Sequence, residues 1–311
     1  QGRFHRTSAS TIVFEHTHGA AVKMTALETL TKPLDALEVD VARASDRAKL
    51  YAEPDFQEKL ADRIDGMLKG RKVLSLDVFD TLILRDNTAE VARFFEVAGK
   101  MAELASAETG RKVTQIDAFL ARQMGTQATY RASTRKKGCR EGSFSEIHAT
   151  AARLLTGKDD LCADFIDAEL QNETHRIVPN PFFSSYIEEA RARGVTVLLL
   201  SDMYMHASHI EDLLSRLGID PDAYDALLSS ADTKVSKASG GIFSVVEQEL
   251  RVKANDVVHI GDSRTGDVLR PIQHGWSALH LPLSDRDIAL RKQAEKEFAV
   301  MLASDFNLSL D

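Results

Sequence analysis

The chain has 311 residues, a hydrophobic fraction of 43%, a charged fraction of 28% and a formal net charge of −8. These values are typical of an ordinary soluble protein with one large domain or two modest ones. The acidic balance argues against a general nucleic-acid-binding role, and no apolar run approaches the roughly 20 residues that span a bilayer, so no membrane contact is expected.

Cys139 and Cys162 stand apart in the sequence and form no metal-type pair, so a reducing, cytoplasmic location is expected. The chain begins Gln1-Gly2-Arg3, without an initiator Met or the apolar segment of a signal peptide. We interpret residues 1–23, which show no periodic pattern, as either a leader without fixed structure or an addition to the native sequence. Homo-oligomers are compatible with the sequence, which specifies no oligomeric state.

Residues 24–69 have a helical pattern that Pro33 and Pro54 interrupt. A stripe of apolar residues at four-residue spacing predicts a helix with one buried face: Phe56, Leu60, Ile64 and Leu68. No motif in this part indicates a function. Packing on the rest of the protein and self-association are both open for it.

An apolar strand follows and ends in a carboxylate, in the stretch Val73-Leu74-Ser75-Leu76-Asp77. Open α/β sheets place their chemistry at such strand ends. Residues 87–175 then carry four helical patterns. We predict a capping signal at 87–90 that opens the first helix, a second helix over about 113–131, a third that the capping box starting at Ser143 opens, and a fourth over about 160–175.

From residue 179 onward, apolar strands alternate with helices, which predicts a parallel sheet covered on both faces. We expect strands at 195–200, 226–230, 257–260 and 277–281, and helices at 182–193, 207–217, 241–250 and 267–274. Polar motifs follow several of these strands: Ser201-Asp202, then Lys237 in Lys237-Ala238-Ser239-Gly240-Gly241-Ile242-Phe243, then Gly261-Asp262-Ser263-Arg264-Thr265-Gly266-Asp267.

The ordered set of motifs between residues 73 and 267 resembles the haloacid dehalogenase (HAD) superfamily, whose members are mostly Mg²⁺-dependent phosphatases. The sequence Ser75-Leu76-Asp77-Val78-Phe79-Asp80-Thr81-Leu82 is similar to a bacterial branch of predicted hydrolases that is sometimes found beside glycosyltransferases. The resemblance implies a doubly wound, Rossmann-like α/β core at residues 71–86 and 176–285, and a helical C1 cap at 87–175. We expect residues 1–70 to form an N-terminal extension and 286–311 a C-terminal helix that packs on the core.

The resemblance also implies roles for individual residues. Asp77 would be the nucleophile that forms an aspartyl-phosphate, and Ser201 and Lys237 would hold the phosphoryl oxygens; Lys237 fits the family spacing better than Lys234. Mg²⁺ would bind Asp77, the backbone carbonyl of Phe79 and Asp262, with Asp267 as a further ligand or a support for one. The residues expected around a small phosphomonoester, such as a sugar phosphate, are Thr81, Ser201, Asp202 and Lys237.

Phe79 departs from the family pattern, because HAD phosphatases carry a second Asp two residues after the nucleophile as their general acid and base. A phenyl ring cannot transfer a proton, and loss of acid–base help costs a factor of about 10² to 10⁴. Asp80 either takes over proton transfer or only stabilises the turn.

Three functions remain open at this point. The first is a phosphatase that uses Asp80 or a cap residue as acid and base. The second is a dehalogenase-like hydrolase, because dehalogenases carry an aromatic residue at the position of Phe79. The third is a metal-binding module that depends on a partner and has little turnover. The carboxylates of Asp262 and Asp267 favour phosphoryl chemistry over dehalogenation.

Two further features have competing interpretations. Arg131, Arg135, Lys136, Lys137 and Arg140 form a basic segment, which we interpret as a solvated, mobile linker rather than a substrate-binding surface. Arg264 either contacts substrate or pairs with an acidic residue.

Overall fold

The computed structural model describes residues 35–309, all of which belong to one compact unit. The expectations for residues 1–23, and the helical pattern expected over 24–34 with its break at Pro33, lie outside the described residues. The described part of the chain starts with three helices: α2 (Ala36–Arg43), α3 (Arg47–Ala52) and α4 (Pro54–Leu68). Pro54 is the first residue of α4, a position where its missing N–H costs nothing. The predicted stripe of α4 is fully confirmed, because all four of its residues are buried.

A five-stranded parallel sheet forms the centre, in the order β5-β4-β1-β6-β7. Its strands are β1 (Val73–Leu76), β4 (Thr196–Ser201), β5 (Ala226–Ser229), β6 (Val257–Gly261) and β7 (Ser277–His280). Each predicted strand is present, with ends that differ by one residue at most. Their apolar runs are long because both faces of the sheet are covered.

Alternate residues of the strands face two separate clusters of the core. Leu74, Val197 and Val258 pack with residues of α4, α9 (Phe183–Ala192) and α10 (Ala207–Arg216). Val73, Leu198 and Val257 pack on the opposite side, against α12 (Gly241–Leu250) and Trp276. The period of two along each strand therefore fills both layers.

Short elements complete the connections around the sheet. They are the 3₁₀ turns Pro221–Ala223 and Ala254–Asp256, α11 (Ser230–Thr233), a π-helical segment at Arg264–Leu269 and α13 (Arg270–His274). The π-helical segment and α13 replace the single helix predicted at 267–274.

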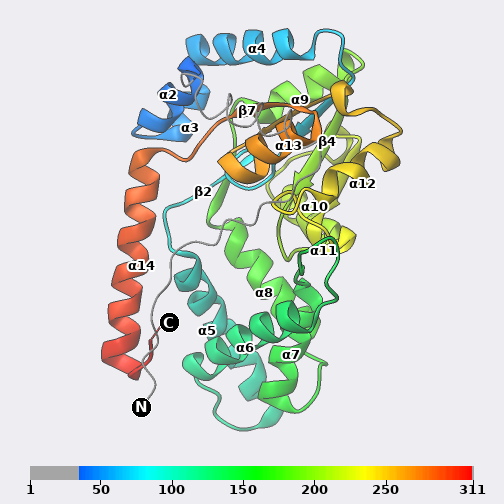
Figure 1. Cartoon of the computed structure of the whole chain (residues 1–311). Helices are drawn as coiled ribbons and strands as arrows, with labels where there is room; N and C mark the ends of the chain where they lie inside the picture. Colours follow the sequence, from blue (N-terminus) through cyan, green and yellow to red (C-terminus); the bar gives the residue numbers. More distant parts are fainter. Residues whose placement is uncertain (1–34, 310–311) are drawn as a thin grey trace, which may run out of the picture. The chain divides into compact units, whose positions relative to one another are not determined.

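Four helices are inserted between β1 and β4, as predicted: α5 (Glu90–Thr109), α6 (Gln115–Ala132), α7 (Phe144–Thr156) and α8 (Cys162–Thr174). They form a group beside the sheet (Figure 1). Two short antiparallel strands, β2 (Ile83–Arg85) and β3 (Ile177–Pro179), carry the chain into and out of the insertion.

The capping predictions for this insertion had different outcomes. Ser143 caps α7 by accepting a hydrogen bond from the amide of Glu146. The signal at 87–90 is wrong, because Ala89 is the N-cap of α5 and makes no side-chain cap. Asn87 instead donates to Asp287, so a tertiary contact takes the polar side chain away from the helix end.

The C-terminal helix α14 (Asp285–Phe306) contacts the turn at Asp80 through Arg291 and also contacts the inserted helices. It runs beside α5 of the inserted helices, and it also contacts α2 (Figure 1). Phe298 of α14 lies with its ring centroid 5.6 Å from that of Phe95 and 6.0 Å from that of Phe119. The apolar side of this helix therefore finds its partners in the insertion, where aromatic rings are available, rather than in the α/β core.

Among the described residues, no helix combines the length and the apolar character that a membrane crossing requires.

Candidate active site

The predicted motif residues meet at the carboxyl ends of neighbouring strands. Asp77 follows β1, Ser201 ends β4 and Asp262 follows β6, and parallel pairing brings these ends to one edge of the sheet. A cavity of about 420 Å³ opens there. Its lining includes residues of the sheet edge and of the insertion: Asp77, Phe79, Asp80, Ser201, Asp202, Lys237, Asp262, Asp267, Arg85, Glu90, Tyr130 and Tyr204.

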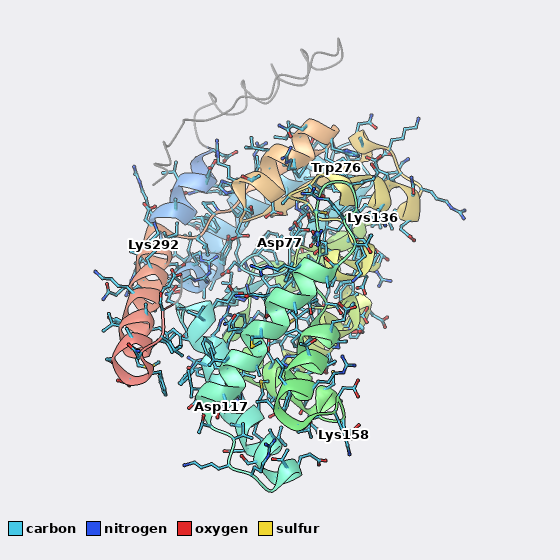
Figure 2. All side chains as sticks on the ribbon, turned by 60° about the horizontal axis from the view of Figure 1, so that its bottom comes forward. Asp77, Asp117, Lys136, Lys158, Trp276 and Lys292 are labelled. Atoms are coloured by element: carbon cyan, nitrogen blue, oxygen red, sulfur yellow. The ribbon has the colours of Figure 1, made fainter. Side chains whose placement is uncertain are left out.

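Asp77 is 7% exposed and lies in the interior, unlike the exposed Lys158 and Lys292 (Figure 2). Lys237 Nζ lies 2.5 Å from Oδ1 of Asp77. Burial raises the pKa of Asp77 and the ammonium group opposes this effect. Burial also disfavours the charged Lys237, but the carboxylates of Asp267 and Asp77 outweigh it and raise the pKa of Lys237 above its usual value. The site therefore holds a permanent positive charge beside the proposed nucleophile.

Lys237, and not Lys234, occupies the site. Its Nζ also lies 2.6 Å from Oδ1 of Asp267. The Asp202 carboxylate accepts hydrogen bonds from the amides of Lys237 and Ala238 at 2.7 and 3.0 Å. Asp202, which was expected to contact the substrate, thus holds the backbone at Lys237 and Ala238. Lys234 lies in the left-handed region with φ 59° and lines a different cavity.

Asp77, Asp262 and Asp267 form a cluster suited to a divalent cation. One carboxylate oxygen from each lies within 4.8 Å of the others. Burial, followed by the charges of Asp80 and Asp267, raises the pKa of Asp262 to about 6. No described donor is hydrogen-bonded to the Asp262 carboxylate. Three carboxylates with one ammonium group between them keep net negative charge, and hard oxygen ligands of this kind fit Mg²⁺. The Phe79 carbonyl, the remaining predicted ligand, belongs to the turn that follows Asp77.

Asp267 is held by several donors. His259 Nε2 lies 3.0 Å from Oδ1, and the amide of Ser263 donates to Oδ2 at 2.8 Å. The other ring nitrogen of His259 bonds Ser75 Oγ at 2.8 Å, so His259 is a satisfied core residue. A Cβ at position 261 would lie 2.3 Å from Cγ of Asp267, which is why this position needs glycine. Because its carboxylate already accepts hydrogen bonds from His259 and Ser263, Asp267 is better suited to position Lys237 than to act as a direct metal ligand.

Asp80 has a different environment from that of a proton donor. Its carboxylate accepts hydrogen bonds from Arg47 at 2.7 Å and from Arg291 at 2.7 and 2.9 Å. Burial by itself raises the pKa of Asp80, but Arg291 and Arg47 outweigh it and hold the pKa well below its usual range. Its φ of 65° is that of a left-handed turn residue. This arrangement favours the turn-stabilising role and disfavours proton transfer by Asp80.

Two expected phosphate-binding hydroxyl groups lie in different places. Ser201 is 1% exposed and lines the cavity. Thr81 is fully buried and does not line it, and no described residue bonds its hydroxyl group. We therefore place Ser201, rather than Thr81, in reach of a substrate.

Arg264 pairs with Glu38 of α2 at 3.1 Å, which decides between its two interpretations. Glu38 also bonds His280 Nδ1 at 2.7 Å, and the other nitrogen of His280 bonds the Asp262 carbonyl at 2.8 Å. Arg47 of α3 bonds Asp80 and Asp287. The described part of the N-terminal extension thus supports the loops that carry Asp80 and Asp262.

The basic segment of the insertion does not line the cavity. Its cationic side chains are exposed, as expected of a solvated segment. Lys136 nevertheless donates to the carbonyl of Thr233 at 2.9 Å, so the segment touches the core.

Three wall residues were not identified from the sequence: Arg85, Glu90 and Tyr130. Arg85 ends the short apolar run Leu82-Ile83-Leu84, which is a weak signal for a functional charge. Glu90 and Tyr130 carry no local signal, because only the docking of α5 and α6 brings them to the cavity. Tyr204 also reaches it, and its hydroxyl group donates at 2.8 Å to Glu169, which pairs with the fully buried Arg122 of the insertion.

A family model described as haloacid dehalogenase-like hydrolase matches residues 71–272. No curated protein matches the chain. Solved structures that are similar include the 2-haloacid dehalogenase of Pseudomonas syringae pv. Tomato DC3000, with 16% identity, coverage of 74% of this chain and 100% of that one, and a TM-score of 0.47. The L-2-haloacid dehalogenase of Xanthobacter autotrophicus has 18% identity and a TM-score of 0.44, and the match covers 77% of this chain and 85% of that one. A HAD family enzyme of Bacteroides thetaiotaomicron, solved with magnesium and inorganic phosphate, has 17% identity and a TM-score of 0.42. The match covers 68% of this chain and 94% of that one.

Proposed function

The chain belongs to the haloacid dehalogenase-like hydrolases, and we propose that it is a Mg²⁺-dependent phosphatase that acts on small phosphorylated substrates through an aspartyl-phosphate on Asp77. One observation carries this proposal. The buried Asp77 carboxylate lies against Lys237 and within 4.8 Å of two further carboxylates. Attack on a neutral carbon needs neither a metal nor excess negative charge, whereas a phosphoryl group needs both its charge and its position controlled.

In the proposed reaction, Asp77 attacks phosphorus and Lys237 neutralises charge on the transferring oxygens. The Ser201 hydroxyl group at the end of β4 donates to one of these oxygens. Asp77, Asp262 and the Phe79 carbonyl would hold Mg²⁺, supported by Asp267; when bound, the ion offsets the repulsion between the carboxylate and the phosphoryl group. Water then attacks the aspartyl-phosphate and releases phosphate.

The insertion at α5–α8 is, in this proposal, a C1-type cap that closes the cavity against bulk water. Its contribution of Glu90 and Tyr130 to the cavity wall supports this role. The size of the cavity, about 420 Å³, suits a small substrate.

The first prediction tests the nucleophile. Phosphate release from a panel of phosphomonoesters and acyl phosphates is measured with Mg²⁺ and with EDTA. We expect metal-dependent turnover that Asp77→Asn lowers by a factor of about 10³ or more, because the covalent step is lost. Asp62→Asn, a matched change at an exposed residue of α4, should keep full turnover. Full activity of Asp77→Asn would remove Asp77 as the nucleophile.

Phe79 favours a second candidate, a dehalogenase-like hydrolase, because a halide leaves without a proton. The same assay therefore includes 2-chloropropionate, with halide release as the readout. Halide release that needs no metal, without phosphate release, would replace the phosphatase proposal. Mg²⁺ binding without turnover of any compound would instead favour a partner-dependent, non-catalytic role.

A further inference from the structure

Among the described residues, neither Phe79 nor Asp80 offers, beside the nucleophile, the proton donor that a poor leaving group would need. Phe79 occupies the position next to the nucleophile where an acid would serve, and it is 7% exposed. The carboxylate of the adjacent Asp80 is occupied by Arg47 and Arg291, which both donate hydrogen bonds to it. An alkoxide leaving group has a high proton affinity, so its departure without protonation is slow.

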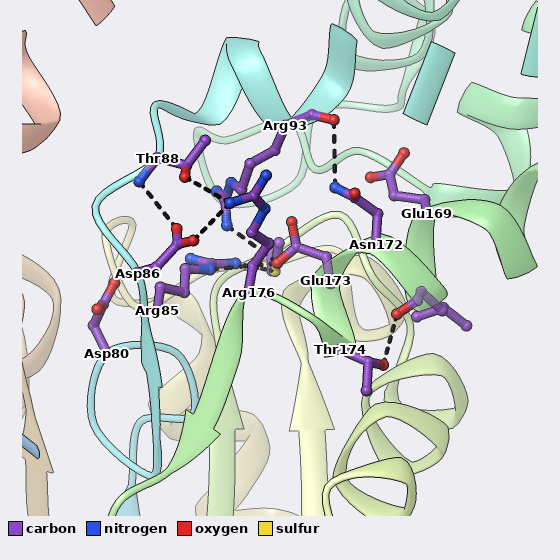
Figure 3. A network of polar contacts seen from close by, with 12 residues as sticks. Asp80, Arg85, Asp86, Thr88, Arg93, Glu169, Asn172, Glu173, Thr174 and Arg176 are labelled. Carbon is purple, nitrogen blue, oxygen red and sulfur yellow. Dashed lines mark hydrogen bonds and ion pairs between the residues drawn. The ribbon is translucent and has the colours of Figure 1, made fainter. Parts of the chain in front are cut away.

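A positive charge lies at the same place instead. The guanidinium carbon of Arg85 is 4.0 Å from the centroid of the Phe79 ring, and Arg85 lines the cavity. Arg85 reaches from β2 towards Glu173 of α8 (Figure 3). Arginine remains protonated at all ordinary pH values, so it can stabilise an anion through charge and hydrogen bonds but cannot supply a proton to it.

Arg85 has a counter-charge in Glu173, but its guanidinium group keeps hydrogen-bonding capacity. Its Nε is ion-paired with Glu173 at 3.6 Å, which is too long for a hydrogen bond, and no described partner accepts a hydrogen bond from this atom. Its Nη2 has Met203 Sδ, a weak acceptor, at 3.6 Å. Glu173 has a shorter contact with Arg93, at 3.1 Å. The Arg85 side chain is only 15% exposed, so an anion beside it would interact in a poorly solvated place.

We infer that the preferred substrates are compounds whose leaving group departs as a stable anion, namely acyl phosphates and phosphoric anhydrides, and that Arg85 receives the departing carboxylate or phosphate. This inference rests on the proposed phosphatase function and narrows its substrate class. Alkyl phosphates, which include most sugar phosphates, then become poor substrates.

The reaction balances without an acid. An Asp77 oxygen forms a bond to phosphorus, and the bridging P–O bond breaks, with its electron pair leaving on the carboxylate or phosphate that faces Arg85. Water oxygen then bonds to phosphorus and the bond from phosphorus to the Asp77 oxygen breaks. The two water protons remain on the released phosphate or pass to solvent, and Asp77 returns as a carboxylate.

The test compares leaving groups on the whole protein in Mg²⁺. Acetyl phosphate supplies a carboxylate leaving group, pyrophosphate a phosphate, substituted phenyl phosphates a graded series, and glycerol phosphate an alkoxide. We expect kcat/KM for acetyl phosphate or pyrophosphate to exceed that for glycerol phosphate by about 10²-fold or more, because no acid assists the alkoxide. The two activated compounds distinguish a carboxylate from a phosphate as the leaving group.

Variants of Arg85 show whether it acts on the leaving group. Arg85→Gln should steepen the dependence of kcat/KM on leaving-group pKa. Arg85→Lys, which keeps a positive charge, should bring this dependence part of the way back to that of the wild type. A purely structural role would lower all rates alike. Glu173 keeps Arg93 as a partner in both variants, and circular dichroism checks that they fold.

Phe79→Asp supplies the missing acid and Phe79→Asn is its matched control. A rate gain on glycerol phosphate of about tenfold or more in the Asp variant alone supports the inference. No gain in either variant counts against it.

Several results would overturn the inference. Equal kcat/KM across the panel would do so while leaving the phosphatase proposal intact. So would Glu90→Gln or Tyr130→Phe if either selectively abolished hydrolysis of glycerol phosphate, since a wall residue would then be the acid. Absence of phosphate release from every compound would overturn both the inference and the proposed function.

Discussion

The Asp80 carboxylate accepts hydrogen bonds from two arginines that lie far from it in sequence, by 33 residues for Arg47 and 211 for Arg291. Arg47 comes from α3 and Arg291 from α14, so three segments meet at the turn that follows Asp77. Asp80 is 4% exposed, and ion pairs in such surroundings are costly to break from one side. Asp80 therefore connects the turn after Asp77 to α3 near the start of the described chain and to α14 near its end.

The second prediction concerns Asp80→Asn. The change leaves Arg47 and Arg291 without their shared anion, so the free energy of unfolding at neutral pH should fall by about 3–5 kcal/mol. Urea unfolding measures it, with the exposed Asp62→Asn as a control that should change stability by about 0.5 kcal/mol at most. A loss no larger than that of the control would contradict the role assigned to Asp80.

The pH dependence of the same pair of proteins is the third prediction. The pKa of Asp80 is lowered in the folded state, so the unfolded state takes up the proton first as pH falls. The stability that Asp80 contributes is fully present above the ordinary Asp pKa of about 4 and is lost below it. The difference in unfolding free energy between wild type and Asp80→Asn should therefore shrink as pH falls below about 4. A difference that stays constant down to pH 3 would contradict this assignment.

The helix α14 connects the α/β core to the inserted helices. At one end Arg291 and Asp287 pair with Asp80 and Arg47. Further along, Phe298 packs against Phe95 and Phe119 of the insertion. A cap that opened as a rigid body would have to separate from this helix or carry it along.

The fourth prediction concerns Phe298→Ala. Phe298 is 8% exposed, and its removal should lower the unfolding free energy by about 3–5 kcal/mol. Hydrogen exchange should show lost protection in α5 and α6 rather than in the sheet, because the lost contacts are with Phe95 and Phe119. Val300→Ala on the same helix, at a residue that is 63% exposed, should have little effect. Uniform loss of protection across sheet and insertion would argue against a local role for α14.

At the scale of the whole molecule, a metal ion bound by the carboxylates at the sheet edge should raise the free energy of unfolding. The Asp262 carboxylate has no described hydrogen-bond donor, and its pKa is raised to about 6 mainly by burial and then by neighbouring negative charge. A cation bound only by the folded protein stabilises it by about 2.7 kcal/mol at a concentration 100 times its Kd.

The fifth prediction follows from this linkage. Added Mg²⁺ should raise the Tm of the wild type by a few degrees, with a shift that grows with Mg²⁺ concentration. Asp262→Asn should abolish the shift, whereas Asp62→Asn should retain it. An unchanged Mg²⁺ response in Asp262→Asn would exclude Asp262 as a ligand.

Local patterns predicted most of the fold and the centre of the site. The apolar runs before Asp77, Ser201 and Asp262 identify strands, and parallel pairing then brings their carboxyl ends together without further information. The apolar stripe of α4 and the capping residue Ser143 could also be predicted from the local sequence, because helix period and capping depend on neighbours within one or two turns.

Tertiary packing decided the features that distinguish this protein from its family pattern. The sequence left Asp80 as either an acid or a turn residue, and in the folded structure two arginines from distant helices donate hydrogen bonds to its carboxylate. Arg85 acquires significance only because β2 places it over Phe79, and α14 packs on the insertion because Phe95 and Phe119 are there to receive Phe298. Such contacts join segments that are far apart in sequence, and their free energy depends on how all the elements pack. Motifs and periodicity therefore determined where the chemistry lies, while the folded structure determined which charges surround it.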